Sequence, residues 1–277
     1  MEMLNQRIGF IGAGNMASAI ISGMLRAGLV AEEQIVVSDI STEQLRLIEG
    51  KTRVRTLENN AWVVDRSDVI IFCVKPFHMA NVCAELQPYA SPDKLFISIC
   101  AGITTPFIEE RLGGGADAMP VRVVRVMSNT PALVGCGAAA IAPGRHASTT
   151  DVALAVNIFQ SVGTTVVLEE EKLDVVTGLS GSGPAYFFYF AEALIVAGIE
   201  LGLTESESRM LVMQTFLGAA RMAHESGMLL GELRAAVTTK GGTTEAGLRA
   251  LDESGFIELA YRCVENAARR SRELSKQ

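Results

Sequence analysis

The chain has 277 residues and a formal net charge of −7 at pH 7, with 49% hydrophobic, 20% charged and only 6% aromatic residues. A chain of this length usually forms two domains, and this composition is typical of helices packed on a parallel sheet, so we exclude a disordered chain. The negative charge, with no cluster of Lys and Arg, opposes binding to a phosphate backbone, and we expect no nucleic-acid partner.

Short apolar runs alternate with helical patterns in the first part of the chain. The first run, residues 7–11, leads into a glycine turn and a helix over 16–25. The second helix begins at the N-cap Ser41 and continues through residue 48. Further strands are predicted at 35–38, 69–74, 95–99, 122–127, 138–142 and 164–168, with a helix at 150–161 between the last two. This alternation predicts an α/β fold with right-handed βαβ crossovers and a parallel sheet of the Rossmann type.

The turn after the first strand fits the dinucleotide pattern G-x-G-x-x-[GA]. Gly12 permits the tight turn, and Gly14 lets backbone N–H groups approach a pyrophosphate at the positive end of the next helix. A structural turn without a ligand is the alternative interpretation. The residues expected to contact the dinucleotide here are Gly12, Ala13, Gly14, Asn15 and Met16.

Asp39 ends the second strand, where a carboxylate in this fold accepts hydrogen bonds from the adenosine ribose. Its charge would repel the 2′-phosphate of NADP and favours NAD, whereas Ser38 and Ser41 offer hydroxyls to such a phosphate. If Asp39 is only a helix N-cap, this argument disappears. The choice between NADPH and NADH therefore stays open.

Three more loops follow strands at the edge of the sheet where ligands bind. They contribute Val74, Lys75 and Pro76, then Ala101 and Gly102, then Asn129 and Thr130. Lys75, Asn129 and Thr130 offer polar groups to the nicotinamide ribose or carboxamide. The alternative for Lys75 is a purely solvated ammonium group.

Strand signals disappear after residue 168. We therefore predict a dinucleotide-binding domain over residues 1–168 and an all-helical domain over residues 169–277. Residues 185–203 approach the length of a membrane span, but Glu192 and Glu200 interrupt the apolar run. We expect a helix buried within its domain or in a dimer interface, and no membrane partner.

Two polar glycine-rich loops are predicted in the helical half, at 180–185 and 237–248. Consecutive N–H groups and hydroxyls at a helix start favour binding of a carboxylate, and simple helix capping by Thr243 or Thr244 is the alternative. The residues expected to bind substrate are Ser182, Gly183, Pro184, Gly241, Gly242, Thr243 and Thr244.

The cysteines and histidines are scattered and lack the spacing of a metal site, so we expect no metal. The five cysteines are expected to be reduced core residues: Cys73, Cys83, Cys100, Cys136 and Cys263. The N-terminus does not resemble a signal peptide, and we expect a cytoplasmic protein.

Motifs along essentially the whole chain resemble the pyrroline-5-carboxylate reductase family. They lie at residues 8–17, 74–76, 101–104, 129–131, 176–186 and 241–248, and the last two are specific to that family. The resemblance implies hydride transfer from NADPH or NADH to the C=N bond of 1-pyrroline-5-carboxylate, which gives L-proline in the last step of proline biosynthesis. One departure is Lys240, where relatives often have proline, and it puts the rigidity of this loop in doubt.

The same resemblance implies roles for single residues and for a second subunit. The loop around Gly242 would cradle the substrate carboxylate, Thr244 would face the ring nitrogen as the catalytic residue, and Asn60 would approach the adenosine side of the cofactor. The helical domain would interleave with that of a second subunit in a homodimer, so that each site borrows residues from its partner, and dimers would assemble into a decamer. A protonated cyclic imine is already electrophilic, so catalysis would depend on orienting donor and acceptor.

Two other functions fit parts of the sequence. A β-hydroxyacid dehydrogenase shares the first motif, but it needs a helix lysine accompanied by asparagine, and Lys172 stands in a Glu-rich stretch instead. A non-enzymatic NAD(P)-binding sensor would lack a second polar pocket, and the loop around Gly242 argues against it.

Overall fold

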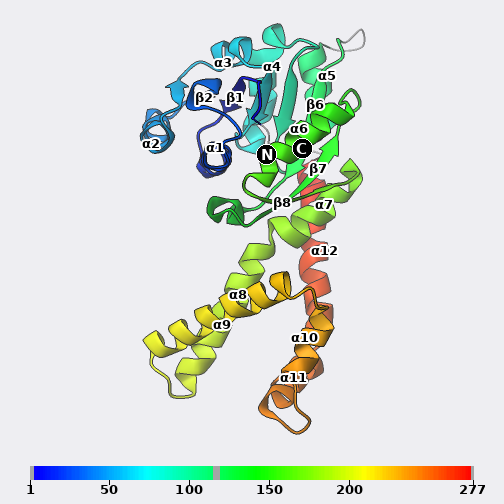
Figure 1. Ribbon diagram of the computed structural model, residues 1–277. Helices are drawn as coiled ribbons and strands as arrows, with labels where there is room; N and C mark the ends of the chain where they lie inside the picture. Colours follow the sequence, from blue (N-terminus) through cyan, green and yellow to red (C-terminus); the bar gives the residue numbers. More distant parts are fainter. Residues whose placement is uncertain (1–2, 115–118, 276–277) are drawn as a thin grey trace. The chain divides into compact units, whose positions relative to one another are not determined.

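In the computed structural model, which describes residues 3–114 and 119–275, the chain forms two compact units (Figure 1). The first unit contains the chain up to Ser182 and again from Asn266, and the second contains Gly183–Glu265. The predicted boundary after residue 168 coincides with the end of the last strand, but the units divide after residue 182. The segment between them stays with the first unit because Leu173 is buried against the sheet beside Ala140 and Ala142.

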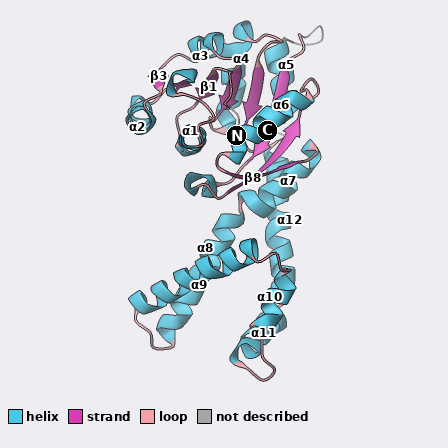
Figure 2. Ribbon diagram, viewed as in Figure 1, coloured by secondary structure: helices cyan, strands magenta, loops and turns pink. Residues whose placement is uncertain are grey.

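An eight-stranded sheet forms the centre of the first unit (Figure 2). Its order is β3-β2-β1-β4-β5-β6-β7-β8, so the strand order reverses between β1 and β4. The strands are β1 (Ile8–Ile11), β2 (Ile35–Ser38), β3 (Arg55–Leu57), β4 (Val69–Phe72), β5 (Leu95–Ser98), β6 (Arg122–Met127), β7 (Gly137–Pro143) and β8 (Gly163–Val167). All seven apolar runs predicted from the sequence are confirmed as strands. The reversal of strand order gives the ligand-binding edge of a doubly wound sheet.

Two features of the sheet differ from the predicted pattern. β3 was not predicted, because its three residues are partly exposed at the sheet edge and show no apolar run. β7 runs antiparallel to β6, with Val124 opposite Pro143, whereas the other neighbouring strands are parallel. The link between β6 and β7 contains only a short 3₁₀ helix, η4 (Thr130–Val134), and a parallel crossover needs a longer connection.

Helices cover both faces of the sheet and enclose two apolar cores. The helices are α1 (Asn15–Arg26), α2 (Thr42–Thr52), α3 (Asn60–Arg66), α4 (Met79–Leu86), α5 (Thr105–Gly113) and α6 (Thr149–Gln160). One core contains Phe10 and Ile20 with Phe159 of α6, and the other contains Phe72 with Ile108 of α5. This three-layer arrangement confirms the predicted Rossmann-type domain.

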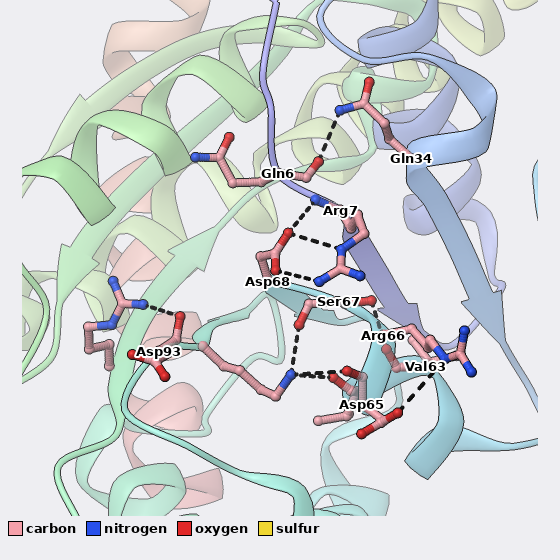
Figure 3. A network of polar contacts seen from close by, with 12 residues as sticks. Gln6, Arg7, Gln34, Val63, Asp65, Arg66, Ser67, Asp68 and Asp93 are labelled. Atoms are coloured by element: carbon pink, nitrogen blue, oxygen red, sulfur yellow. Dashed lines mark hydrogen bonds and ion pairs between the residues drawn. The ribbon is translucent and has the colours of Figure 1, made fainter.

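The amino ends of the strands are tied together by polar contacts within the protein (Figure 3). Arg7, before β1, donates from its main-chain N and its guanidinium to the carboxylate of Asp68, before β4. Lys94, before β5, donates to the carbonyl oxygens of Val64 and Ser67 at 2.7 and 2.9 Å. This edge of the sheet therefore satisfies its own polar groups.

The rest of the chain is helical, as predicted. It comprises the 3₁₀ helix η5 (Glu170–Lys172), α7 (Leu173–Val176), the π-helical turn η6 (Thr177–Gly181), α8 (Gly183–Glu200), α9 (Glu205–Glu225), α10 (Leu230–Ala236), α11 (Thr243–Glu253) and α12 (Phe256–Leu274). α12 begins in the second unit and ends in the first. Its last turns are held there by Ser271, whose hydroxyl donates to Asp174 at 2.6 Å.

Of the two predicted ways to bury the apolar helix at 185–203, within its domain or in a dimer interface, the first is wrong for the single chain. Phe188 and Tyr189 of α8 are 58% and 75% exposed, and only Gly183 and Ala191 of this helix are buried. Within the described residues, Glu170–Glu200 is one helical stretch with the length and composition of a membrane span. Exposed apolar area of this extent marks a surface that binds something outside the chain.

The cysteines are all free thiols, but they are not all core residues. Cys83 and Cys100 are buried, and burial raises the pKa of their thiols to about 12 and about 11. Cys73 and Cys263 are half-buried. Cys136 is exposed, contrary to the prediction, because it follows the short η4 helix at the surface instead of lying inside an apolar run.

Candidate active site

The glycine turn between β1 and α1 has the geometry of an anion site. Gly12 has a φ of +104°, and a Cβ there would lie 2.7 Å from the carbonyl oxygen of Cys73, so only glycine fits. Gly14 is the N-cap of α1, no side chain caps this helix, and a Cβ on Gly14 would meet open space. Asn15 and Met16 form the first turn, whose N–H groups are left to a ligand.

Asp39 is bonded to this turn. Its Oδ2 accepts a hydrogen bond from the main-chain N of Ala13 at 2.7 Å, and its Oδ1 accepts from the N of Ser41 at 2.8 Å. The N-cap of α2 is Ser41, as predicted, because its hydroxyl accepts from Gln44 N. The alternative that Asp39 is only an N-cap is therefore wrong: the carboxylate joins the glycine turn to the end of β2.

Ser38 and Asn60 lie together beside Asp39. Ser38 is completely buried, and its hydroxyl donates to Asn60 Oδ1 at 2.7 Å. The amide nitrogen of Asn60 in turn donates to a Glu85 carboxylate oxygen at 2.9 Å. The structure thus brings together two residues predicted for the adenosine side, and the Ser38 hydroxyl lies nearer to Asn60 than to its other acceptor, the carbonyl oxygen of Phe10 at 3.4 Å. Glu85 was missed because nothing in the sequence relates α4 to the start of α3.

The loops after β4 and β5 are joined to each other. The Cys100 thiol donates to the carbonyl oxygen of Val74 at 3.2 Å. Gly102 has a φ of +74° in the turn that follows. Lys75 and Pro76 are exposed at the start of a 3₁₀ helix, η2 (Pro76–His78). The hydrogen bond between Cys100 and Val74 holds the predicted cofactor loops, 74–76 and 101–102, beside each other.

Asn129 holds protein segments in place. Its Oδ1 accepts from Ala138 N at 2.9 Å, and its amide nitrogen donates to the carbonyl oxygen of Ser180 at 3.0 Å. Asn129 is buried, whereas Thr130 beside it is exposed. The structure therefore brings the loop after β6 against the glycine-rich segment that precedes α8.

That segment is helical, so the prediction of a loop over 180–185 is wrong. Residues Thr177–Gly181 form a π-helical turn, in which the N–H of Ser182 donates to the carbonyl oxygen of Thr177 at 2.8 Å. Gly183 and Pro184 then begin α8, and proline is tolerated there because first-turn N–H groups have no partner within the helix. Single π-helical turns of this kind occur frequently at functional sites.

The second glycine segment does form a loop before α11. Gly241 has a φ of +75°, and its N–H donates to Glu245 Oε2 at 2.8 Å. Gly242 is the N-cap and no side chain caps the helix, so the alternative of capping by Thr243 or Thr244 is wrong. Both threonines are exposed in the first turn. Among the described residues no side chain accepts from these first-turn N–H groups, which suits a carboxylate ligand.

The predicted site residues fall in both compact units. Those expected to bind the dinucleotide lie in the first unit together with Ser182, and those expected to bind the substrate from Gly183 onward lie in the second. Over residues 3–114 and 119–275, no group of three His, Cys, Asp or Glu side chains is arranged to hold a metal ion.

Comparisons with known proteins point to one family. A family profile described as pyrroline-5-carboxylate reductase dimerisation matches residues 170–274, and one described as NADP oxidoreductase, coenzyme F420-dependent, matches residues 7–102. The chain is 42% identical to the pyrroline-5-carboxylate reductase of Methanosarcina acetivorans, over 99% of this chain and 100% of the relative. It is 41% identical to that of Pseudomonas aeruginosa, over 99% of both chains.

Solved structures agree with the sequence relatives. A pyrroline-5-carboxylate reductase from Coxiella burnetii matches with a TM-score of 0.91 and 37% identity, over 99% of this chain and 100% of that one. A Plasmodium falciparum pyrroline carboxylate reductase with NADP bound matches with a TM-score of 0.85 and 31% identity, at the same coverage. A prephenate dehydrogenase from Aquifex aeolicus, at a TM-score of 0.55 and 15% identity, shares the fold alone.

Proposed function

Because this chain belongs to the pyrroline-5-carboxylate reductase family, we propose that its glycine turn at Gly12 binds the dinucleotide and that the start of α11 binds the substrate of a reductase. The chain is an NAD(P)H-dependent oxidoreductase that reduces the C=N bond of 1-pyrroline-5-carboxylate and yields L-proline. The observation that carries this conclusion is identity of 42% over the whole length of a reductase of that name. The β-hydroxyacid dehydrogenase and sensor alternatives have no comparable support.

The residues of the first unit fit a dinucleotide. The open first turn of α1 offers N–H donors to the pyrophosphate, and Asp39 holds the turn in the conformation that presents them. Ser38 and Asn60 would lie at the adenosine side, and the loops at 74–76, 101–102 and 129–130 at the nicotinamide side. NAD(P)H, when bound, supplies the hydride.

The start of α11 would bind the substrate. Its uncapped N–H groups and the positive end of the helix suit the carboxylate of the imino acid, with Gly242 and Thr243 in contact. The Thr244 hydroxyl would hydrogen-bond the ring nitrogen and hold the C=N carbon toward the hydride donor. Ser182, Gly183 and Pro184 would border the same substrate. Because a protonated imine needs no strong acid, orientation carries most of the catalysis.

The helical half is a dimerisation domain, since the family profile of that name covers residues 170–274. We propose that a second copy covers the exposed aromatic face of α8, that the two helical domains interleave, and that each site uses residues of both subunits. Further assembly of dimers into a decamer is part of the same proposal. A partner subunit accounts for an apolar helix without a membrane, so we place the enzyme in the cytoplasm with no membrane or nucleic-acid partner.

A direct assay tests this function. Purified protein is mixed with 1-pyrroline-5-carboxylate and either NADPH or NADH, and the loss of reduced cofactor is followed by absorbance while proline is quantified. Proline formation equal to cofactor oxidation is the expected result. Cofactor oxidation with a keto acid and none with the imine would overturn the assignment.

A further inference from the structure

One carboxylate joins three segments of the first unit. Glu170, at the start of η5, accepts hydrogen bonds from Thr105 N at 2.8 Å and from the Thr105 hydroxyl at 2.6 Å. It also pairs with Arg125 Nη1, from the middle of β6, at 3.1 Å. The side chains of Arg125 and Glu170 are only 3% and 19% exposed, so water screens these contacts weakly.

Thr105 is the point where the cofactor loop becomes a helix. It is the first residue of α5 and follows Ala101–Thr104 directly. Its N–H is one of the first-turn donors that the helix cannot satisfy itself, and Glu170 supplies the acceptor. The Thr104 hydroxyl accepts from Phe107 N, one turn on. The start of α5 is therefore held both by its own N-cap, Thr104, and by Glu170.

The remainder of the loop is held from two other directions. At its beginning, the Cys100 thiol donates to Val74 O. In its middle, Gly102 packs against Leu274 of α12, since a Cβ at Gly102 would lie 3.2 Å from the Leu274 Cβ. Once Thr105 is held, the loop at 101–104 has little conformational freedom. A small displacement of Thr105 would therefore move the loop.

The contact between Glu170 and Thr105 also depends on the charge of Arg125. Within the described part of the chain, Glu170 is the one carboxylate at ion-pair distance from Arg125, and the second guanidinium nitrogen of Arg125 is buried without a hydrogen-bond partner. Loss of Glu170 would leave a buried positive charge unpaired. The ion pair thus fixes the position of Glu170, and Glu170 fixes Thr105.

We propose that Glu170 is a positioning residue for hydride transfer, which acts through Thr105 on the loop at 101–104 that borders the nicotinamide ring. This inference rests on the proposed function, because it requires that loop to line the cofactor. It assigns a role in reduction to a residue outside every motif of the site. It also predicts that damage to the network affects the cofactor and leaves the substrate carboxylate, bound at α11, largely undisturbed.

Graded substitutions test the proposal. Thr105→Val keeps the shape and removes only the hydroxyl contact, and Glu170→Gln removes the charge. Replacing both Arg125 and Glu170 by Met removes the pair without leaving a buried charge, which protects against simple unfolding. We expect Thr105→Val to raise the KM and the Kd for NAD(P)H about three- to tenfold, which is less than loss of a direct hydrogen bond to a charged group would give, because Thr105 acts on the cofactor only through the loop. Thr105→Ser should restore wild-type values, and the KM for the imine should stay within about twofold of wild type.

A matched control separates positioning from stability. Arg122, at the other end of β6, pairs with Asp151 at 2.6 Å, away from the carboxyl edge of the sheet. Asp151→Asn should lower the Tm as Glu170→Gln does but leave the KM for NAD(P)H unchanged. Wild-type cofactor constants in Thr105→Val and Glu170→Gln, at a temperature where both are folded, would overturn the proposal. So would an equal rise in KM in Asp151→Asn.

The cofactor Kd, measured by nicotinamide fluorescence without substrate, keeps this inference distinct from the proposed function. If the wild-type protein binds NAD(P)H with a Kd that depends on Glu170 but does not reduce the imine, the proposed function fails and the role of Glu170 in holding the cofactor loop is supported. If the imine is reduced and the Kd for NAD(P)H is the same in wild type and in Glu170→Gln, the proposed function is supported and the inference about Glu170 fails.

Discussion

Asp39 has two separate effects, one on the geometry of the glycine turn and one on the local charge. Its carboxylate holds the N–H groups of Ala13 and Ser41, so it shapes the glycine turn for any dinucleotide. In the proposed cofactor site, its negative charge would also lie near the 2′-phosphate of NADPH. Substitutions at this position therefore have to separate geometry from charge.

We expect Asp39→Asn to raise the kcat/KM ratio of NADPH to NADH, because the amide oxygen can still accept one of the two N–H groups while the charge is lost. Asp39→Ala should raise the KM for both cofactors, because the turn loses its anchor. Steady-state kinetics with each cofactor measure both effects. Ser148→Ala, which removes the N-cap of α6 in the same unit, is the control for stability and should leave the ratio unchanged. An unchanged ratio in Asp39→Asn would show that Asp39 does not select the cofactor.

Thr244 should be needed for turnover more than for binding of the cofactor. Thr244→Ala removes the hydroxyl proposed to meet the ring nitrogen, and we expect kcat to fall about ten- to a hundredfold, as for one hydrogen bond to a charged group. The Kd for NAD(P)H should not change. Thr244→Ser is the matched control and should retain most of the activity. A wild-type kcat in Thr244→Ala would remove the catalytic role from this residue.

At the scale of elements, the two edges of the sheet differ in how their polar groups are satisfied. At the amino edge, Arg7 and Asp68 join the starts of β1 and β4 within the protein. At the carboxyl edge, α1 begins without a side-chain cap. The contacts at the first edge therefore contribute to stability, whereas at the second edge the start of α1 is left open for binding.

The contact between Arg7 and Asp68 makes the stability of the first unit depend on pH. Its side-chain hydrogen bond is the main cause that lowers the pKa of Asp68 below its ordinary value. A carboxyl group whose pKa is lower in the folded state stabilises the fold above its unfolded pKa of about 3.9, and this contribution is lost as pH falls through the folded pKa. Urea midpoints of wild-type protein and Asp68→Asn should therefore differ at pH 7 and converge below about pH 4. Because both side chains are partly exposed, the difference should be small and should shrink in salt. A constant difference across this pH range would contradict the assignment.

At the scale of the whole molecule, the helical half of a single chain leaves the apolar helix α8 largely exposed. The exposed aromatic residues of α8 lie in a segment that matches a dimerisation profile. Side chains of this kind dominate the buried centres of protein interfaces. In the proposed dimer, a second chain would therefore cover these side chains.

A charge on the exposed apolar surface of α8 should separate the subunits. We expect Leu194→Asp, on α8 where the side chain is 46% exposed, to yield monomers and to abolish imine reduction, because each site would lose its partner's residues. Binding of NAD(P)H to the first unit should persist. Light scattering after size exclusion measures the first effect and fluorescence the last. Leu47→Asp, on α2 with 61% exposure, is the control and should remain dimeric. Dimers of Leu194→Asp with full activity would place the interface elsewhere.

The sequence by itself determined the features whose signals are local along the chain. Four features depend on neighbours within a few positions, through backbone freedom, periodicity and capping: the strand at Ile8–Ile11, the turn at Gly12, the N-cap at Ser41 and the first turn of α8 with Pro184. The family motifs belong to the same class, because residue type and spacing are enough to identify them.

Tertiary structure alone decided which distant groups meet. The contacts of Asp39 with Ala13 and of Asn60 with Glu85 span 26 and 25 positions, and that of Thr105 with Glu170 spans 65. The antiparallel β7, the two internal partners of Asn129 and the exposure of α8 also emerged only from the fold. The physical reason is that such contacts depend on how whole elements pack. The type of a residue limits which bonds it can form, but the packing decides which partner lies close enough to form them.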